Sequence, residues 1–214
     1  MSTSPTIADA VGRPAVSTSP AGRDLQARET TPVAEDDHLM RLVAEDDAVA
    51  FQRLVARWQQ PVFAFLARMV GSNEDALDLT QEVFVRIHRE RKRYRPAGRF
   101  RSWLFRIAGN QARSSLRRRR LLHWVHFDPH RHDSAVVGDS AASQREREQL
   151  GERVRAAIAA LPERQRQAIV LRRFEQMNYE EIAQTLATTA PAVESLLQRA
   201  MVTLKRDLGP WMVG

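Results

Sequence analysis

The chain has 214 residues, of which 43% are hydrophobic and 28% charged, and it carries a formal net charge of +7 and no cysteine. This length allows one medium-sized domain or two small ones, and the lack of cysteine excludes disulfides and thiolate metal sites. No apolar run approaches the roughly 18–20 residues of a membrane span, and no signal-peptide pattern opens the chain. We therefore expect a soluble, cytoplasmic protein.

The first third of the sequence changes character near Glu35. Residues 1–34 are rich in Ser, Thr, Pro, Ala and Gly without periodicity, which predicts a disordered tail. Beyond it, apolar residues recur at helical spacing. They predict a short helix, a second helix that starts at Asp46–Asp47, and a third segment that Pro61 opens or kinks and Gly71 ends.

Residues 75–88 have the pattern of an amphipathic helix. We expect Ser72 to cap it, with Asp75 reaching back to complete a capping box. The expected inward residues are Leu77, Thr80, Val83, Phe84 and Ile87. The opposite face carries Asp78, Gln81 and Glu82, which form either an ordinary solvated surface or a docking surface for a basic partner.

A basic segment follows the turn at residues 96–98. Between Arg86 and Arg120 the sequence has fourteen arginines and lysines against one acid, Glu90, so positive charge is concentrated here. Phe100, Trp103 and Phe105 are interleaved with the arginines, as suits stacking on unpaired bases, although some of these rings must belong to the core. The alternatives are a solvated arginine-rich face or, for residues 113–120, a helix that binds RNA or a membrane surface.

The signal weakens over residues 121–147, which we interpret as a flexible linker. This stretch contains four histidines: His123, His126, His130 and His132. Imidazoles are suitable zinc or nickel ligands, but these four share no helical face and no cysteine assists them. We therefore expect no metal site.

The last part of the chain, residues 148–210, again has helical periodicity. Asn178 and Thr188–Thr189 are expected to cap two successive helices joined by a short turn, which is the pattern of a helix-turn-helix. The shared core of this pair would contain Ile182, Ala183, Leu186, Val193 and Leu197. The polar outer edge of the second helix would face the base edges of a major groove.

Four short motifs follow one another along the chain: DLTQEVF at 78–84, FRSWLFRIAGN at 100–110, LPERQR at 161–166 and YEEIA at 179–183. In this order they resemble the extracytoplasmic-function (group IV) sigma factors of the sigma-70 family of bacterial RNA polymerase. The resemblance covers about residues 35–120 and 148–208. It implies two all-helical domains, sigma domain 2 (35–120) and sigma domain 4 (148–210), that bind core RNA polymerase and promoter DNA, together with an expected anti-sigma partner and no cofactor.

The resemblance also assigns residues to three surfaces. Core polymerase would contact Asp78, Gln81 and Glu82. The minus-ten element would contact Arg99, Phe100, Arg101, Arg106, Asn110, Arg113 and Arg117, with Phe100 and Asn110 capturing a flipped base and the arginines following phosphates. The minus-thirty-five element would contact Arg172, Arg173, Thr189, Ala192, Glu194, Ser195, Gln198 and Arg199.

The chain departs from the family pattern at a few of these places. Glu194 and Leu196 stand where many members have Lys and Arg, so Glu194 either accepts from a cytosine amino group or faces away. Ala187 replaces the usual turn glycine, and Ser114 stands where Asp is frequent. The alternative function is a helix-turn-helix regulator that does not bind polymerase. An enzyme is not expected, because no Gly-rich phosphate loop or catalytic arrangement of Ser, His and Asp is present.

Overall fold

The computed structural model describes residues 32–95, 97–125 and 143–209, and all its regular elements in these ranges are helices. They are α1 (Pro32–Ala44), α2 (Ala48–Val70), α3 (Asn73–Glu90), the 3-10 helix η1 (Arg91–Arg93), α4 (Phe100–Val125), α5 (Ser143–Ala160), α6 (Glu163–Arg173), α7 (Tyr179–Leu186) and α8 (Ala190–Leu208). The prediction of an all-helical fold is confirmed. α4 and α5 extend into both ends of the expected linker, whose remaining residues, like residues 1–31 of the expected tail, lie outside the described ranges.

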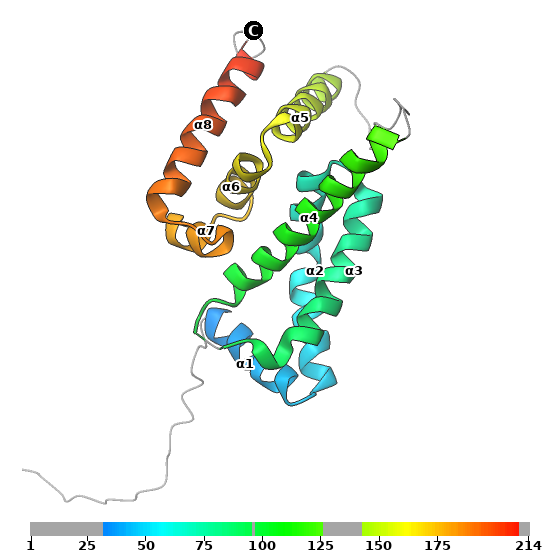
Figure 1. Ribbon diagram of the computed structural model, residues 1–214, viewed down its shortest axis with the longest axis vertical. Helices are drawn as coiled ribbons and strands as arrows, with labels where there is room; N and C mark the ends of the chain where they lie inside the picture. The colour runs from blue at the N-terminus through cyan, green and yellow to red at the C-terminus, as the bar shows by residue number, and fades with distance from the viewer. Residues whose placement is uncertain (1–31, 96, 126–142, 210–214) are drawn as a thin grey trace, which may run out of the picture.

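The helices form two groups that lie side by side (Figure 1). The first group contains α1 to α4, with α2 packed against α1, α3 and α4, and the second contains α5 to α8. α4 also packs against α7, and α2 against α5 and α6. The buried apolar side chains of both groups therefore form one continuous core, with Phe65 and Phe105 in the first half and Leu171 and Ile182 in the second.

α2 is one helix of 23 residues, although Pro61 predicted a break or a kink near its middle. It begins at Asp47, whose carboxylate accepts hydrogen bonds from the backbone N–H groups of Val49 and Ala50 at 2.8 and 3.0 Å. It ends at Gly71, whose φ of 74° is readily adopted only by glycine. Residues on both sides of Pro61 bury the same stripe, and this packing offsets the hydrogen bond that proline cannot donate.

α3 begins as predicted at Ser72, whose hydroxyl accepts from the N–H of Asp75 at 3.2 Å. The second half of the expected capping box is absent here, because the Asp75 carboxylate pairs with Arg119 of α4. The expected inward position of Leu77 is also wrong, since its side chain is 55% exposed and Leu79 is buried in its place. The other inward residues of this helix are buried as expected.

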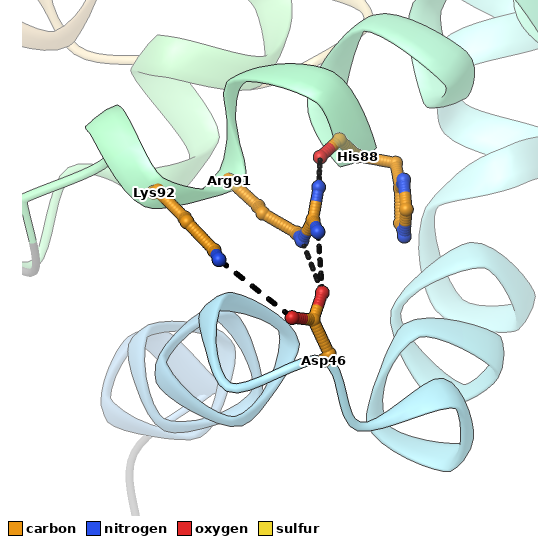
Figure 2. A network of polar contacts seen from close by, with 4 residues as sticks. All are labelled: Asp46, His88, Arg91 and Lys92. Atoms are coloured by element: carbon orange, nitrogen blue, oxygen red, sulfur yellow. Dashed lines mark hydrogen bonds and ion pairs between the residues drawn. The ribbon is translucent and has the colours of Figure 1, made fainter.

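The turn between α1 and α2 is tied to η1 by the carboxylate of Asp46 (Figure 2). This carboxylate accepts from Arg91, with a distance of 2.8 Å to Nε, and forms a longer ion pair of 3.7 Å with Lys92. A second nitrogen of Arg91 donates to the backbone carbonyl of His88 at 2.8 Å. The hydrogen bonds from Arg91 hold the pKa of Asp46 below its usual value, so the carboxylate stays charged and keeps this contact.

Candidate functional site

An acidic groove of about 780 Å³ runs along the solvent side of α3. It is lined by Asp78, Gln81, Glu82, Val85, Arg86, Arg89, Glu90 and Gln111. The groove therefore brings together the three residues that the sequence assigned to one face, and all three are exposed. Val85 adds an apolar contact that is half exposed, and Arg86 is engaged by Glu90 at 2.9 Å. The carboxylates of Asp78 and Glu82 have no ion-pair partner among the residues that the structure describes, so they are accessible to a basic partner.

The polar residues assigned to the minus-ten element fall into two sets on and before α4. Arg99, Arg106 and Arg117 are exposed, and Arg101 is partly exposed. Arg113 and Asn110 are partly buried, and an Arg113 nitrogen donates to the Asn110 side-chain oxygen. The first set is therefore the more accessible of the two to an anionic polymer.

Phe100 belongs to the core, so the expectation that its ring stacks on a base does not fit this structure. The side chain is 1% exposed. Its ring packs against Trp58, Tyr94 and Trp103, with centroids 5.9 to 6.0 Å away. Phe100 fixes the first turn of α4 against α2, and Trp103, which is partly buried, lies nearer to the surface.

α6, in the second half of the chain, contacts the partly buried pair of Asn110 and Arg113 through its residue Gln167. Gln167 of α6 is fully buried and accepts a hydrogen bond from Arg113 at 2.9 Å. Arg166, also buried, reaches across to the backbone carbonyl of Met69 at the end of α2 at 2.6 Å. A further nitrogen of Arg166 donates to the carbonyl of Leu161 at 3.1 Å. The Arg113–Gln167 hydrogen bond joins α6 to the face of α4 that carries Asn110 and Arg113, and the Arg166–Met69 hydrogen bond joins α6 to the end of α2.

A cleft of about 540 Å³ separates the start of α4 from the start of α7. One wall contains Arg99 and Arg101, and the other contains Glu175, Glu180 and Glu181. Ser102 closes part of the floor by donating to the carbonyl of Glu181 at 3.3 Å. In this arrangement carboxylates stand opposite the cations that the sequence assigned to phosphate contacts.

Glu175 gives this arrangement a pH dependence. Burial raises the pKa of its carboxyl above the ordinary 4.5, and Arg101 and Arg68 offset the effect only in part. A carboxyl whose pKa is raised in the folded state stabilises the fold fully below its unfolded pKa, and this contribution is lost as pH rises through the folded pKa. Glu175→Gln should therefore raise Tm at pH 7 and have little effect at pH 4, measured by thermal unfolding at both values. The exposed Glu180→Gln controls for the lost charge, and an equal change at both pH values would contradict the prediction.

The helix-turn-helix expected from the sequence is present as α7 and α8. Asn178 and Glu181 form a complete capping box at the start of α7, with bonds of 2.9 and 2.8 Å. The turn passes through Ala187 at φ 51°, so alanine takes the left-handed conformation that glycine usually supplies. Thr189 occupies the cap position of α8 without a side-chain hydrogen bond.

The residues assigned to the minus-thirty-five element lie mostly on the open side of α8. Five of them are exposed: Thr189, Glu194, Ser195, Gln198 and Arg199. Ala192 is partly buried, and Arg173 is exposed on α6. Arg172 has a structural contact, because its guanidinium donates to the carbonyl of Met177 at 3.0 Å and lies over the Tyr179 ring. Glu194 is exposed, so its carboxylate is accessible to the major groove of DNA. Exposure alone does not distinguish a contact with cytosine from an orientation away from the DNA.

No cluster of three or more metal-ligating side chains is found among the described residues. The side chains of the four linker histidines lie outside that part of the chain. Within the described ranges, no helix is both long and apolar enough to cross a membrane.

Comparison with known families divides the chain as the structure does. Residues 54–122 match Sigma-70 region 2, and residues 151–204 match Sigma-70, region 4. The first match contains the acidic groove and the basic face of α4, and the second contains α6, α7 and most of α8.

Three curated relatives match over at least 90% of their own lengths. The chain is 31% identical over 191 residues to the RNA polymerase sigma-H factor of Pseudomonas aeruginosa, covering 82% of this chain and 95% of that protein. It is 36% identical over 162 residues to the RNA polymerase sigma factor CarQ of Myxococcus xanthus, covering 75% and 90%. It is 32% identical over 187 residues to the ECF RNA polymerase sigma-E factor of Haemophilus influenzae, covering 83% and 97%.

Solved structures have the same fold. CnrH, solved in complex with the cytosolic domain of CnrY, superposes with a TM-score of 0.62 at 28% identity, over 82% of this chain and 98% of that one. RpoE from Bartonella quintana, solved with the anti-sigma factor NepR, superposes with a TM-score of 0.62 at 20% identity, over 74% of this chain and 96% of that one. At this identity the similarity supports the fold alone. With both sigma-70 regions matched in order and full-length relatives above 30% identity, the chain is an RNA polymerase sigma factor of the extracytoplasmic-function group of the sigma-70 family.

Proposed function

We propose that this sigma factor binds core RNA polymerase through the acidic groove of α3, captures the separated minus-ten strand with α4, and reads the minus-thirty-five element with α8. Residues 35–120 and 148–210 would be the two working domains. The observation that carries the proposal is the separation of charge within the first domain. Accessible carboxylates lie on α3, while the neighbouring α4 presents exposed arginines. An acidic surface repels the phosphates of DNA, so a docking role for this surface needs a partner other than DNA.

In this structure the two groups of helices are packed together, and we call this packing the closed arrangement. It adds a condition to the proposal. Arg113 is engaged by Gln167, and Asn110 by Arg113, under α6. A DNA strand could reach these groups only after α6 leaves α4. We therefore infer that the two halves separate when the chain binds polymerase and promoter, and that binding energy from both partners offsets the lost contacts.

Transcription in vitro with purified core polymerase on a library of genomic fragments tests the proposal. Transcripts that start at defined sites only when the chain is added are expected. A conventional helix-turn-helix regulator would instead bind specific duplexes without directing initiation by core polymerase, and that result would refute the proposal.

Asn110→Ala should slow open-complex formation by roughly tenfold or more, because a hydrogen bond to a flipped base would be lost. Binding of a minus-thirty-five duplex should not change, since α8 is distant in sequence and belongs to the other group of helices. Permanganate reactivity of unpaired thymines measures opening, and fluorescence anisotropy measures duplex binding. The substitution also removes the hydrogen bond between Asn110 and Arg113, which would make the two halves separate more easily. Slower open-complex formation could therefore not be explained by tighter packing of the two halves. Equal losses in both assays would contradict base capture.

An anti-sigma factor is a further proposed partner, and the proposed place of action is the cytoplasm, where core polymerase works. Support comes from the similarity to CnrH, which was solved with the cytosolic domain of a second protein. Purification of the tagged chain from its own cells should recover a protein that competes with core polymerase for it. Recovery of core polymerase alone under all growth conditions tested would argue against this partner.

A further inference from the structure

A buried carboxylate of α1 joins two points of the segment that leads into α4. Asp37 is 8% exposed. One of its oxygens accepts from the phenol hydroxyl of Tyr94, and the other accepts from the backbone N–H of Gly98 at 2.6 Å. Tyr94 follows η1 and Gly98 precedes α4 by two residues. A single side chain thus fixes how far apart these two points lie.

The neighbouring contacts make this attachment rigid. The Tyr94 ring packs against Phe100 and Trp103, with centroid distances of 5.9 and 4.9 Å. Burial and the Asp37 carboxylate raise the pKa of the Tyr94 phenol, which keeps it protonated as a donor. Just before it, Arg91 is held by Asp46 (Figure 2). α1 and the turn after it therefore hold this segment from one side.

The attached segment presents positive charge to solvent. Arg93, Arg95 and Arg99 are all exposed, and Gly98 and Arg99 line the cleft between the two halves of the chain. Gly98 has a φ of 68°, a conformation that other residues adopt at a cost. We call Arg95, Ala97, Gly98 and Arg99 the basic turn. It lies outside the helices, so its geometry depends on anchors such as Asp37.

We propose that Asp37 is a positioning residue for DNA capture, which holds the basic turn in the geometry in which its arginines contact phosphates of the separated minus-ten strand. This inference rests on the proposed function. Asp37 does not itself touch DNA, because it is buried beneath the turn. A preformed turn binds an anionic strand without the entropy loss of ordering its backbone at the moment of binding.

Substitutions at Asp37 separate positioning from charge. Asp37→Ala removes both hydrogen bonds. Asp37→Asn can still link both points, because the amide oxygen accepts from Gly98 and the amide nitrogen donates to the phenol oxygen of Tyr94, which reverses the direction of that hydrogen bond. Tyr94→Phe removes one of the two. Asp36→Ala is the matched control: Asp36 is equally buried in the same helix, but it accepts from the Trp58 indole at 3.1 Å and has no hydrogen bond to the turn.

The full chain bound to core polymerase is titrated with a labelled single-stranded oligonucleotide that carries the non-template strand of a promoter used by the wild type in vitro. Asp37→Ala should weaken this binding about tenfold, with Tyr94→Phe intermediate and Asp37→Asn close to wild type. Affinity for core polymerase should stay the same in all variants. Hydrogen exchange of the Gly98 amide should accelerate in Asp37→Ala and not in Asp36→Ala.

Equal weakening by Asp37→Ala and Asp36→Ala would overturn the inference, since a general loss of α1 stability would then explain both. Normal strand binding by Asp37→Ala, with wild-type binding intact, would overturn the inference alone. Failure of the wild-type complex to bind the strand would refute the proposed function and this inference with it. If Asp37→Ala does not fold, Tyr94→Phe and Asp37→Asn decide the question by the same order of affinities.

Discussion

Reversing both free carboxylates of the acidic groove, Asp78→Arg with Glu82→Arg, should abolish binding to core RNA polymerase. The two side chains are exposed one helical turn apart on α3, and neither has an ion-pair partner among the described residues, so they are available to cations of another protein. Placing like charges against such a partner costs several kcal/mol, and each 1.4 kcal/mol is tenfold in affinity. We expect a loss of at least about a hundredfold by fluorescence anisotropy with core polymerase.

The fold should tolerate this change, because neither carboxylate contributes to the core. Circular dichroism and Tm should remain near wild type. The matched control is Glu45→Arg with Glu152→Arg, which raises the net charge equally at exposed positions outside the groove. If the control weakens polymerase binding as much as the groove variant, net charge explains the effect and the docking site is wrong.

Periodicity predicted the surfaces of this protein better than it predicted the boundary between surface and core. On α3, apolar residues recur every three to four positions, and this pattern correctly predicted that Asp78, Gln81 and Glu82 lie on the exposed face. It failed at Leu77, because this helix has more apolar residues than its buried stripe can hold. Leu79 takes the inward position, and the surplus side chain at Leu77 remains on the surface beside the acidic residues.

Contacts between residues far apart in the chain were not predictable from one sequence. Periodicity places Phe100 on a helix, but only the approach of Trp58 from α2 and Tyr94 from beyond η1 buries its ring. The same holds for Asp37, which the sequence shows only as one acid among several. Arg166 was visible as part of a family motif, whereas its hydrogen bond to Met69 depends on how the two halves pack.

Gly109→Ala should open the closed arrangement of the free chain. A Cβ at this position in α4 would lie 2.0 Å from Nε2 and 2.8 Å from Cδ of Gln167, so this fully buried side chain would have to shift. Overpacking of this kind costs about 1–3 kcal/mol, while alanine in a helix is intrinsically better than glycine by up to about 1 kcal/mol. The substitution should therefore separate α6 from α4 without weakening α4. Small-angle scattering should show a larger radius of gyration.

The open form should also bind the labelled single strand more tightly in the absence of polymerase, because Asn110 and Arg113 become accessible. Gly151→Ala is the matched control, since its Cβ would meet only the end of the Arg155 side chain at 3.5 Å. Adding Gln167→Ala should reverse the effect of Gly109→Ala by making room for the new methyl group. In the wild-type background the same Gln167→Ala should loosen closure slightly, because Arg113 loses its partner. This opposite sign in the two backgrounds is the specific consequence of direct packing between residues 109 and 167. An unchanged radius in Gly109→Ala, or the same sign in both backgrounds, would mean that this contact does not hold the halves together.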